Sequence, residues 1–90
     1  MVEKSFKITA ETGIHAQSAV YLVNEAIKYN SNVILEVEGK KINMKSIMGV
    51  MSLGVYQGAV VTLHIDGVDE TQAMAGIENQ IYNLKLGKEY

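Results

Sequence analysis

The chain has 90 residues, with eight basic and ten acidic side chains, a formal net charge of −2 and no cysteine. A single domain spanning residues 1–90 is expected, because domains usually run to about 100–200 residues, and the absence of cysteine excludes disulfides, thiolate zinc sites and cysteine nucleophiles. All the basic residues are lysines, and the lack of arginine, with the negative net charge, argues against direct binding of nucleic acid.

Hydrophobic periodicity predicts four strands and three helices. Alternating apolar residues mark the strands, and apolar residues three or four apart mark the helices. In chain order the predicted elements are a strand over 2–8, a helix from Ala16 that ends at 30–32, strands over 33–37 and 40–44, a short helix over 47–53, a strand over 59–66 and a helix from near Asp69 to Leu84. Each strand has one apolar side, so we predict an α+β open-faced β-sandwich in which three helices pack on one face of a four-stranded antiparallel sheet.

Local signals mark turns and helix ends. Glu38-Gly39 stands where a tight hairpin turn is expected. Ser46 is a helix N-cap candidate with Gly54 as the stop. Asp69 and Gln72 have capping-box spacing. The expected core stripes are Ala19, Leu22, Val23, Ala26 and Ile27 in the first helix, Ile47, Val50 and Leu53 in the second, and Ala73, Ile77, Ile81 and Leu84 in the third.

The two histidines occupy different surroundings. His64 lies on the polar side of its strand and is expected to be solvated, without a role. His15 lies between a glycine-containing loop and the first turn of a helix, where unpaired backbone amides favour a bound anion. An imidazole there can carry a phosphoryl group, with the amides of Ala16 and Gln17 near its oxygens. On position alone, a surface histidine that only closes the loop is the favoured alternative.

Ser46 and the short helix after it also allow two interpretations. A capping hydroxyl explains Ser46 completely. Met48 and Met51 lie off the expected core stripe, beside small residues. Exposed methionines suit a surface that repacks against several partners, although core packing fits their spacing equally well.

No other enzyme motif is present. The glycines match no phosphate-binding loop, and two distant histidines without cysteine make a poor metal site, so neither a metal nor a cofactor is expected. Glu36 and Glu38 share a strand face at a hairpin end, where they are expected to be solvated. No apolar stretch reaches the roughly 20 residues of a membrane helix, and no signal core is present at the N-terminus. The sequence therefore predicts a cytoplasmic protein without membrane contact.

Two segments carry a specific resemblance. Residues 12–16 read Thr-Gly-Ile-His-Ala, and residues 45–54 read Lys-Ser-Ile-Met-Gly-Val-Met-Ser-Leu-Gly. Together they resemble HPr, the histidine-containing phosphocarrier family of the bacterial phosphoenolpyruvate:sugar phosphotransferase system, in its low-GC Gram-positive form. The resemblance covers essentially the whole chain, including the closing helix, and the family fold agrees with the predicted order of elements.

The resemblance implies a carrier in a relay rather than a stand-alone enzyme. His15 would accept a phosphoryl group from Enzyme I and pass it to the Enzyme IIA unit of a sugar permease, in a site that includes Thr12, Ala16 and Gln17. HPr kinase/phosphorylase would phosphorylate Ser46 with ATP, and the product would bind the catabolite control repressor as a corepressor. Nothing demands more than a monomer. The family's docking surface would correspond to Val20, Tyr21, Asn24, Ile47, Met48, Met51 and Ser52.

One departure lies inside the site. Family members have Arg-Pro where this chain has Gln17-Ser18. The lost arginine would supply a charge-assisted hydrogen bond of about 1.5–3 kcal/mol, and Lys45 is the nearest candidate to replace it. Two functions remain open. The chain is either a working phosphocarrier of retuned activity, which we favour, or a regulatory relative that acts mainly through phosphorylated Ser46 and transfers poorly from His15.

Overall fold

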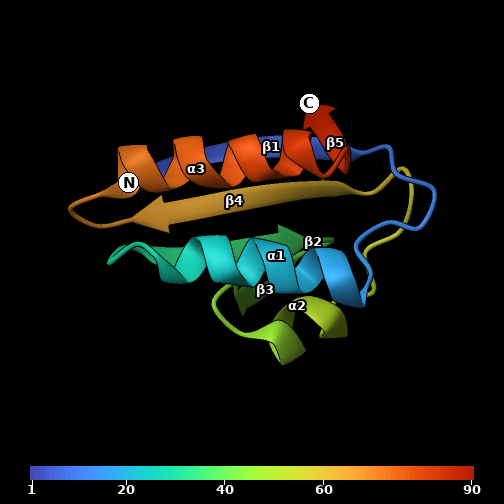
Figure 1. Ribbon diagram of the computed structural model, residues 1–90, viewed down its shortest axis with the longest axis horizontal. Coiled ribbons are helices and arrows are strands. Elements are labelled where there is room, and N and C mark those ends of the chain that lie inside the picture. The colour runs from blue at the N-terminus through green and yellow to red at the C-terminus, as the bar shows by residue number, and fades with distance from the viewer.

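The computed structural model describes residues 1–90 and contains one antiparallel sheet. The sheet has five strands in the order β3-β2-β4-β1-β5. They are β1 (Val2–Ile8), β2 (Asn32–Val37), β3 (Lys40–Asn43), β4 (Val60–Asp66) and β5 (Gly87–Glu89). The helices are α1 (Ala16–Ile27), α2 (Ile47–Ser52) and α3 (Glu70–Asn83), and all three lie on one side of the sheet (Figure 1). The predicted α+β open-faced sandwich is confirmed.

The strand count differs from the prediction by one. β5 has only three residues and pairs with β1, with Phe6 opposite Glu89. Its position depends on Leu86, which is buried and whose carbonyl accepts hydrogen bonds from the amides of Thr9 and Ala10. A strand this short shows no alternation, so periodicity does not reveal it.

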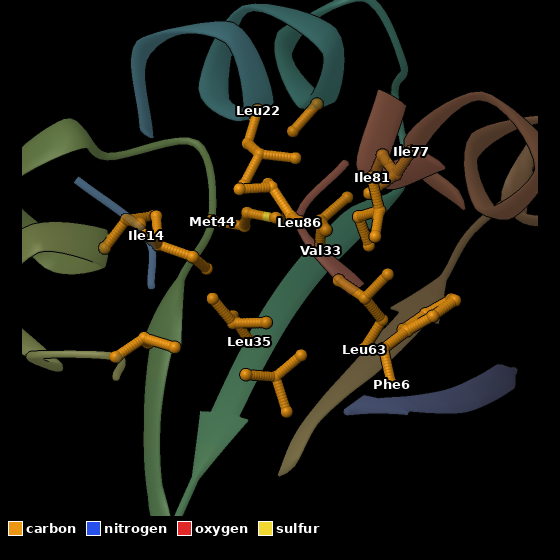
Figure 2. Close-up of a cluster of buried hydrophobic side chains, with 14 of the residues drawn as sticks. Phe6, Ile14, Leu22, Val33, Leu35, Met44, Leu63, Ile77, Ile81 and Leu86 are labelled. Atoms are coloured by element: carbon orange, nitrogen blue, oxygen red, sulfur yellow. The ribbon is translucent and has the colours of Figure 1, made fainter. Parts of the chain in front are cut away.

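The core lies between the sheet and the helices. It contains 22 buried hydrophobic residues, with strand residues such as Leu35 and Leu63 facing Leu22 of α1 and Ile77 of α3 (Figure 2). The helix faces follow the expected stripes with two exceptions. Ile27, the last residue of α1, is 57% exposed, and Ile47, the first residue of α2, is 43% exposed. None of the helices is long and apolar enough to cross a membrane.

The turns position the elements that carry the candidate site. Glu38 and Gly39 both have positive φ, of 52° and 80°, as a two-residue hairpin of type I′ requires. Asp69 does not cap α3 through its side chain, contrary to the predicted capping box. Its carboxylate instead accepts hydrogen bonds from the amides of Asn30 and Ser31 and from the Ser31 hydroxyl. It therefore joins the start of α3 to the end of α1.

The open face of the sheet also differs from the prediction. His64 is not a freely solvated residue: its side chain is only 15% exposed and lies between two carboxylates. Its Nδ1 lies 2.8 Å from Glu3 Oε2 on β1, and its Nε2 lies 2.7 Å from Glu36 Oε1 on β2. Glu36 is therefore paired rather than solvated, and Glu38 also has a partner, the Tyr56 hydroxyl at 2.8 Å. These contacts link three neighbouring strands across the sheet.

Candidate functional site

His15 is the N-cap residue of α1. Its backbone is extended, its side chain is exposed, and its Nδ1 accepts a hydrogen bond from the Gln17 amide at 3.2 Å. An imidazole nitrogen that accepts a hydrogen bond carries a lone pair, so in the neutral ring the proton is on Nε2. The lone pair of Nδ1 thus points at the amides of the first turn, where the helix also presents its positive end.

Ser18 completes the start of the helix. The His15 amide donates to Ser18 Oγ at 3.0 Å, and that hydroxyl donates to the His15 carbonyl at 3.1 Å. Ser18 is only 3% exposed, so these two bonds satisfy a buried hydroxyl. Sequence reasoning treated Ser18 only as the loss of a proline and missed this role. The sequence does carry a signal for this role, because His15 and Ser18 have the three-residue spacing of an N-cap and the residue that hydrogen-bonds back to it in a capping box.

The loop before His15 is held by close backbone contact. Gly13 has a φ of +61°, and a Cβ on it would lie 2.1 Å from the Val55 carbonyl oxygen. The Ile14 amide donates to that same oxygen at 3.2 Å. Gly13 is therefore required both for the left-handed backbone and for the close approach. The loop presents Thr12 at the surface on one side of His15, with Ala16 exposed on the other.

Lys45 does not take the place of the arginine that the family has beside His15. The Nζ of Lys45 donates a hydrogen bond to the Tyr29 carbonyl at 2.7 Å. Tyr29 lies just beyond the last turn of α1, at the opposite end of the helix from His15. Gln17 contributes its backbone amide to the ring and has an exposed side chain. The ring therefore receives a backbone amide hydrogen bond and no contact from Lys45.

Ser46 begins α2 in the way the sequence predicts. Its Oγ accepts a hydrogen bond from the Gly49 amide at 3.1 Å, and its backbone is extended. Gly49 lies close beneath the cap, since a Cβ there would be 3.3 Å from the Asn43 carbonyl oxygen. The Ser46 side chain is half-buried.

Both α1 and α2 carry exposed apolar residues. Met48 is 84% exposed and Met51 is 41% exposed, so packing of both methionines in the core is excluded. Ile47, predicted on the core stripe, is 43% exposed, whereas Val50 is buried. Val20 and Tyr21 of α1 are exposed as well, and α1 lies beside α2 (Figure 1). Asn24 and Ser52 are exposed on the same helices.

Comparisons with known proteins agree on one family. The family described as "PTS HPr component phosphorylation site" matches residues 2–83. A histidine-containing phosphocarrier protein from Mycoplasma is 35% identical over 96% of this chain and 98% of its own, with a TM-score of 0.94. HPr from Thermoanaerobacter tengcongensis is 43% identical over 92% and 93%, with a TM-score of 0.87.

A regulatory relative matches as well. The catabolite repression protein Crh from Bacillus subtilis, as a domain-swapped dimer, is 41% identical over 92% of this chain and 95% of its own, with a TM-score of 0.72. The matches thus include both carriers and a protein of catabolite repression. The match over nearly the whole sequence, together with a histidine that caps the first helix, shows that this chain belongs to the HPr family of phosphotransferase-system phosphocarriers.

Proposed function

We propose that this protein accepts a phosphoryl group on His15 from phosphorylated Enzyme I and passes it to the Enzyme IIA unit of a sugar permease. The observation that carries the proposal is the position of His15 Nδ1, which is exposed and faces the backbone amides that start α1. Helix starts of this kind bind phosphate groups. The proposed setting is the bacterial cytoplasm, where the family's partner enzymes act, and the proposed state is a monomer.

The geometry suggests how His15 is loaded. The lone pair of Nδ1 forms a bond to phosphorus as the bond between phosphorus and Enzyme I breaks, and the ring proton stays on Nε2. The Gln17 amide, which donates to Nδ1 in the free protein, is then available to a phosphoryl oxygen. Transfer to Enzyme IIA is the same step in reverse, with a different acceptor. Thr12 and Ala16 are exposed on either side of His15 in the sequence, and we assign them to the same site.

Gln17 determines how strongly the site is expected to hold the phosphoryl oxygens. It brings a backbone donor but no charge, so the phosphoryl oxygens would be held by neutral amides alone. A charge-assisted hydrogen bond is worth about 1.5–3 kcal/mol, or about 10- to 100-fold in rate. The carrier would therefore work at a reduced or retuned rate.

A second candidate function gives the main role to Ser46. HPr kinase/phosphorylase would phosphorylate Ser46 with ATP, and the product would bind the catabolite control repressor, with little transfer from His15. Two observations favour this alternative: the uncharged Gln17 in the site and the likeness to Crh. The half-buried Ser46 at the start of α2 stands next to the exposed Met48, so either function could use the same surface.

One assay separates the two functions. The protein is incubated with Enzyme I and phosphoenolpyruvate, and acid-labile phosphate is measured, with His15→Ala as the matched control. Label that appears in the unaltered protein and is lost in the control supports the carrier. Absence of label, together with ATP-dependent phosphate on Ser46 from HPr kinase/phosphorylase, would instead favour the regulatory protein. Sedimentation of the same sample tests the proposed monomer, since related chains form dimers.

A further inference from the structure

The loop before His15 rests on the connection between α2 and β4, and the two segments lie side by side (Figure 1). The Ile14 amide donates a hydrogen bond to the Val55 carbonyl at 3.2 Å. A Cβ on Gly13 would lie 2.9 Å from the Tyr56 Cα, so the two backbones are in close contact. The position of His15 therefore depends on how this connection is held.

The Val55 carbonyl belongs to the peptide group that joins Val55 to Tyr56. Because a peptide group is planar, the direction of its oxygen follows from how both residues are held. Val55 is held by its own side chain, which is buried in the core. Tyr56 is 55% exposed, and its hydroxyl donates to Glu38 Oε1 at 2.8 Å. This bond ties the connection to the turn between β2 and β3. It also raises the pKa of the Tyr56 hydroxyl, which stays protonated as the donor at neutral pH.

Glu38 makes this bond from a strained backbone. Its φ of +52° lies in the left-handed region, which the type I′ turn requires and which a glutamate rarely adopts. Glycine, asparagine and aspartate are the residues preferred in such turns. Strained backbone positions cluster at functional sites, where the surrounding structure maintains them. The bond to Tyr56 gives a reason for glutamate here, because the preferred residues have shorter side chains.

Building on the proposed phosphotransfer at His15, we propose that Tyr56 and Glu38 are positioning residues for its ring. Their hydrogen bond holds the peptide group whose oxygen accepts the Ile14 amide, and Ile14 precedes His15 directly. Transfer between bound partners is sensitive to geometry, since a displacement of about 1 Å can cost about 100-fold in rate. The bond itself lies at the surface, so its loss should change the stability of the fold little.

Variants of the two residues separate geometry from charge and stability. Tyr56→Phe removes the donor and keeps the ring and the Glu38 charge. Glu38→Gly removes the acceptor and relieves the strained backbone. Glu38→Gln removes the charge and keeps an acceptor oxygen on a side chain of the same length. The matched control is Tyr82→Phe, because the Tyr82 hydroxyl donates to Glu78 Oε2 at the same distance of 2.8 Å within α3.

The first measurement is single-turnover transfer to His15 at saturating phosphorylated Enzyme I, with urea unfolding alongside. We expect Tyr56→Phe and Glu38→Gly to lower the rate about three- to tenfold. Glu38→Gly should leave the urea midpoint unchanged or raise it. Glu38→Gln and Tyr82→Phe should transfer at nearly the rate of the unaltered protein. The double variant Tyr56→Phe/Glu38→Gly should be no slower than either single variant, because both changes remove the same bond.

The second measurement is hydrogen exchange of the Ile14 amide, which reports on the loop without any transfer. Exchange should be faster by about threefold or more in Tyr56→Phe and Glu38→Gly, and unchanged in Tyr82→Phe.

Three outcomes would overturn the proposal. An unchanged transfer rate in Tyr56→Phe would show that the bond does not position His15. A fall with Glu38→Gln as large as with Glu38→Gly would assign the effect to charge. A lower urea midpoint in Glu38→Gly would assign its slower transfer to a general loss of stability. If the unaltered protein carries no label on His15, the carrier function fails, and Ile14 exchange then decides the role of the bond: faster exchange in Tyr56→Phe supports it and equal exchange refutes it.

Discussion

Replacing Gln17 by arginine should increase transfer of the phosphoryl group to His15. In the free protein the ring nitrogen Nδ1 already accepts a hydrogen bond from the Gln17 backbone amide at 3.2 Å. The backbone donor of the site is therefore already positioned. The exposed side chain at position 17 leaves room for a guanidinium group, which would add charged donors to the phosphoryl oxygens. One such contact is worth about 1.5–3 kcal/mol. The expected gain is therefore about 10- to 100-fold in the rate of the chemical step.

The assay must separate the chemical step from docking. Single-turnover transfer from phosphorylated Enzyme I, at saturating Enzyme I, measures the rate on the bound carrier. The steady-state KM also reports association, and the added arginine places a charge in residues 12–24, which otherwise contain none. Gln17→Lys is the informative control: it adds charge without the planar fork of donors, so its gain should be smaller. Gln17→Met removes the side-chain amide, keeps the backbone amide and adds no charge, so it should not increase the rate.

Two results would contradict this reasoning. Equal single-turnover rates for Gln17→Arg and the unaltered protein would show that position 17 does not limit transfer. A comparable gain with Gln17→Met would show that charge is not the cause. In the first case, backbone amides alone would suffice to hold the phosphoryl oxygens of this carrier.

Three further predictions concern stability and regulation. Gly13→Ala should lower the free energy of unfolding by about 1–2 kcal/mol from its left-handed backbone alone, and by more because of the Val55 carbonyl, as measured by denaturant titration with His15 labelling alongside. The pKa of Asp69 is held below its ordinary value of 3.8, chiefly by the Ser31 hydroxyl, so its stabilisation is complete above about pH 4 and is lost as the pH falls further; Asp69→Asn should destabilise the protein at pH 7 and flatten the acid limb of the pH–stability curve. Ser46→Ala should lose a cap worth about 0.5–2 kcal/mol in the free energy of unfolding. Treatment with HPr kinase/phosphorylase should slow the labelling of His15 in the unaltered protein and leave the rate in Ser46→Ala unchanged.

The fold was largely predictable because most of its strands and helices show a clear hydrophobic periodicity. The alternation of Val61, Leu63 and Ile65 predicts a half-buried strand, and Ser46 with Gly54 brackets a short helix. β5 was not predictable, because three residues carry no pattern and its pairing depends on where Leu86 is anchored.

The contacts made by single polar side chains were harder to predict than the elements. Asp69 had the spacing of a cap, but its carboxylate instead accepts hydrogen bonds from the amides of Asn30 and Ser31, which follow α1. His64 was assigned to the correct face of its strand, yet only the register places Glu3 opposite it. Ser18 was identified as a departure from the family, and its role at the start of α1 required the geometry. In each case the missing information was a partner distant in sequence or a local backbone angle.

The fixed far end of α1 bears on how the protein meets its partners. Lys45 holds the Tyr29 carbonyl, and Asp69 holds the backbone of Asn30 and Ser31, so the chain leaving the helix is tied to two other parts of the fold. The end with His15 is held by its own cap and, through the residue before it, by the hydrogen bond from the Ile14 amide to the Val55 carbonyl. Both ends of α1 are therefore tied to other parts of the fold. A partner that binds near His15 would meet a helix whose direction is already set.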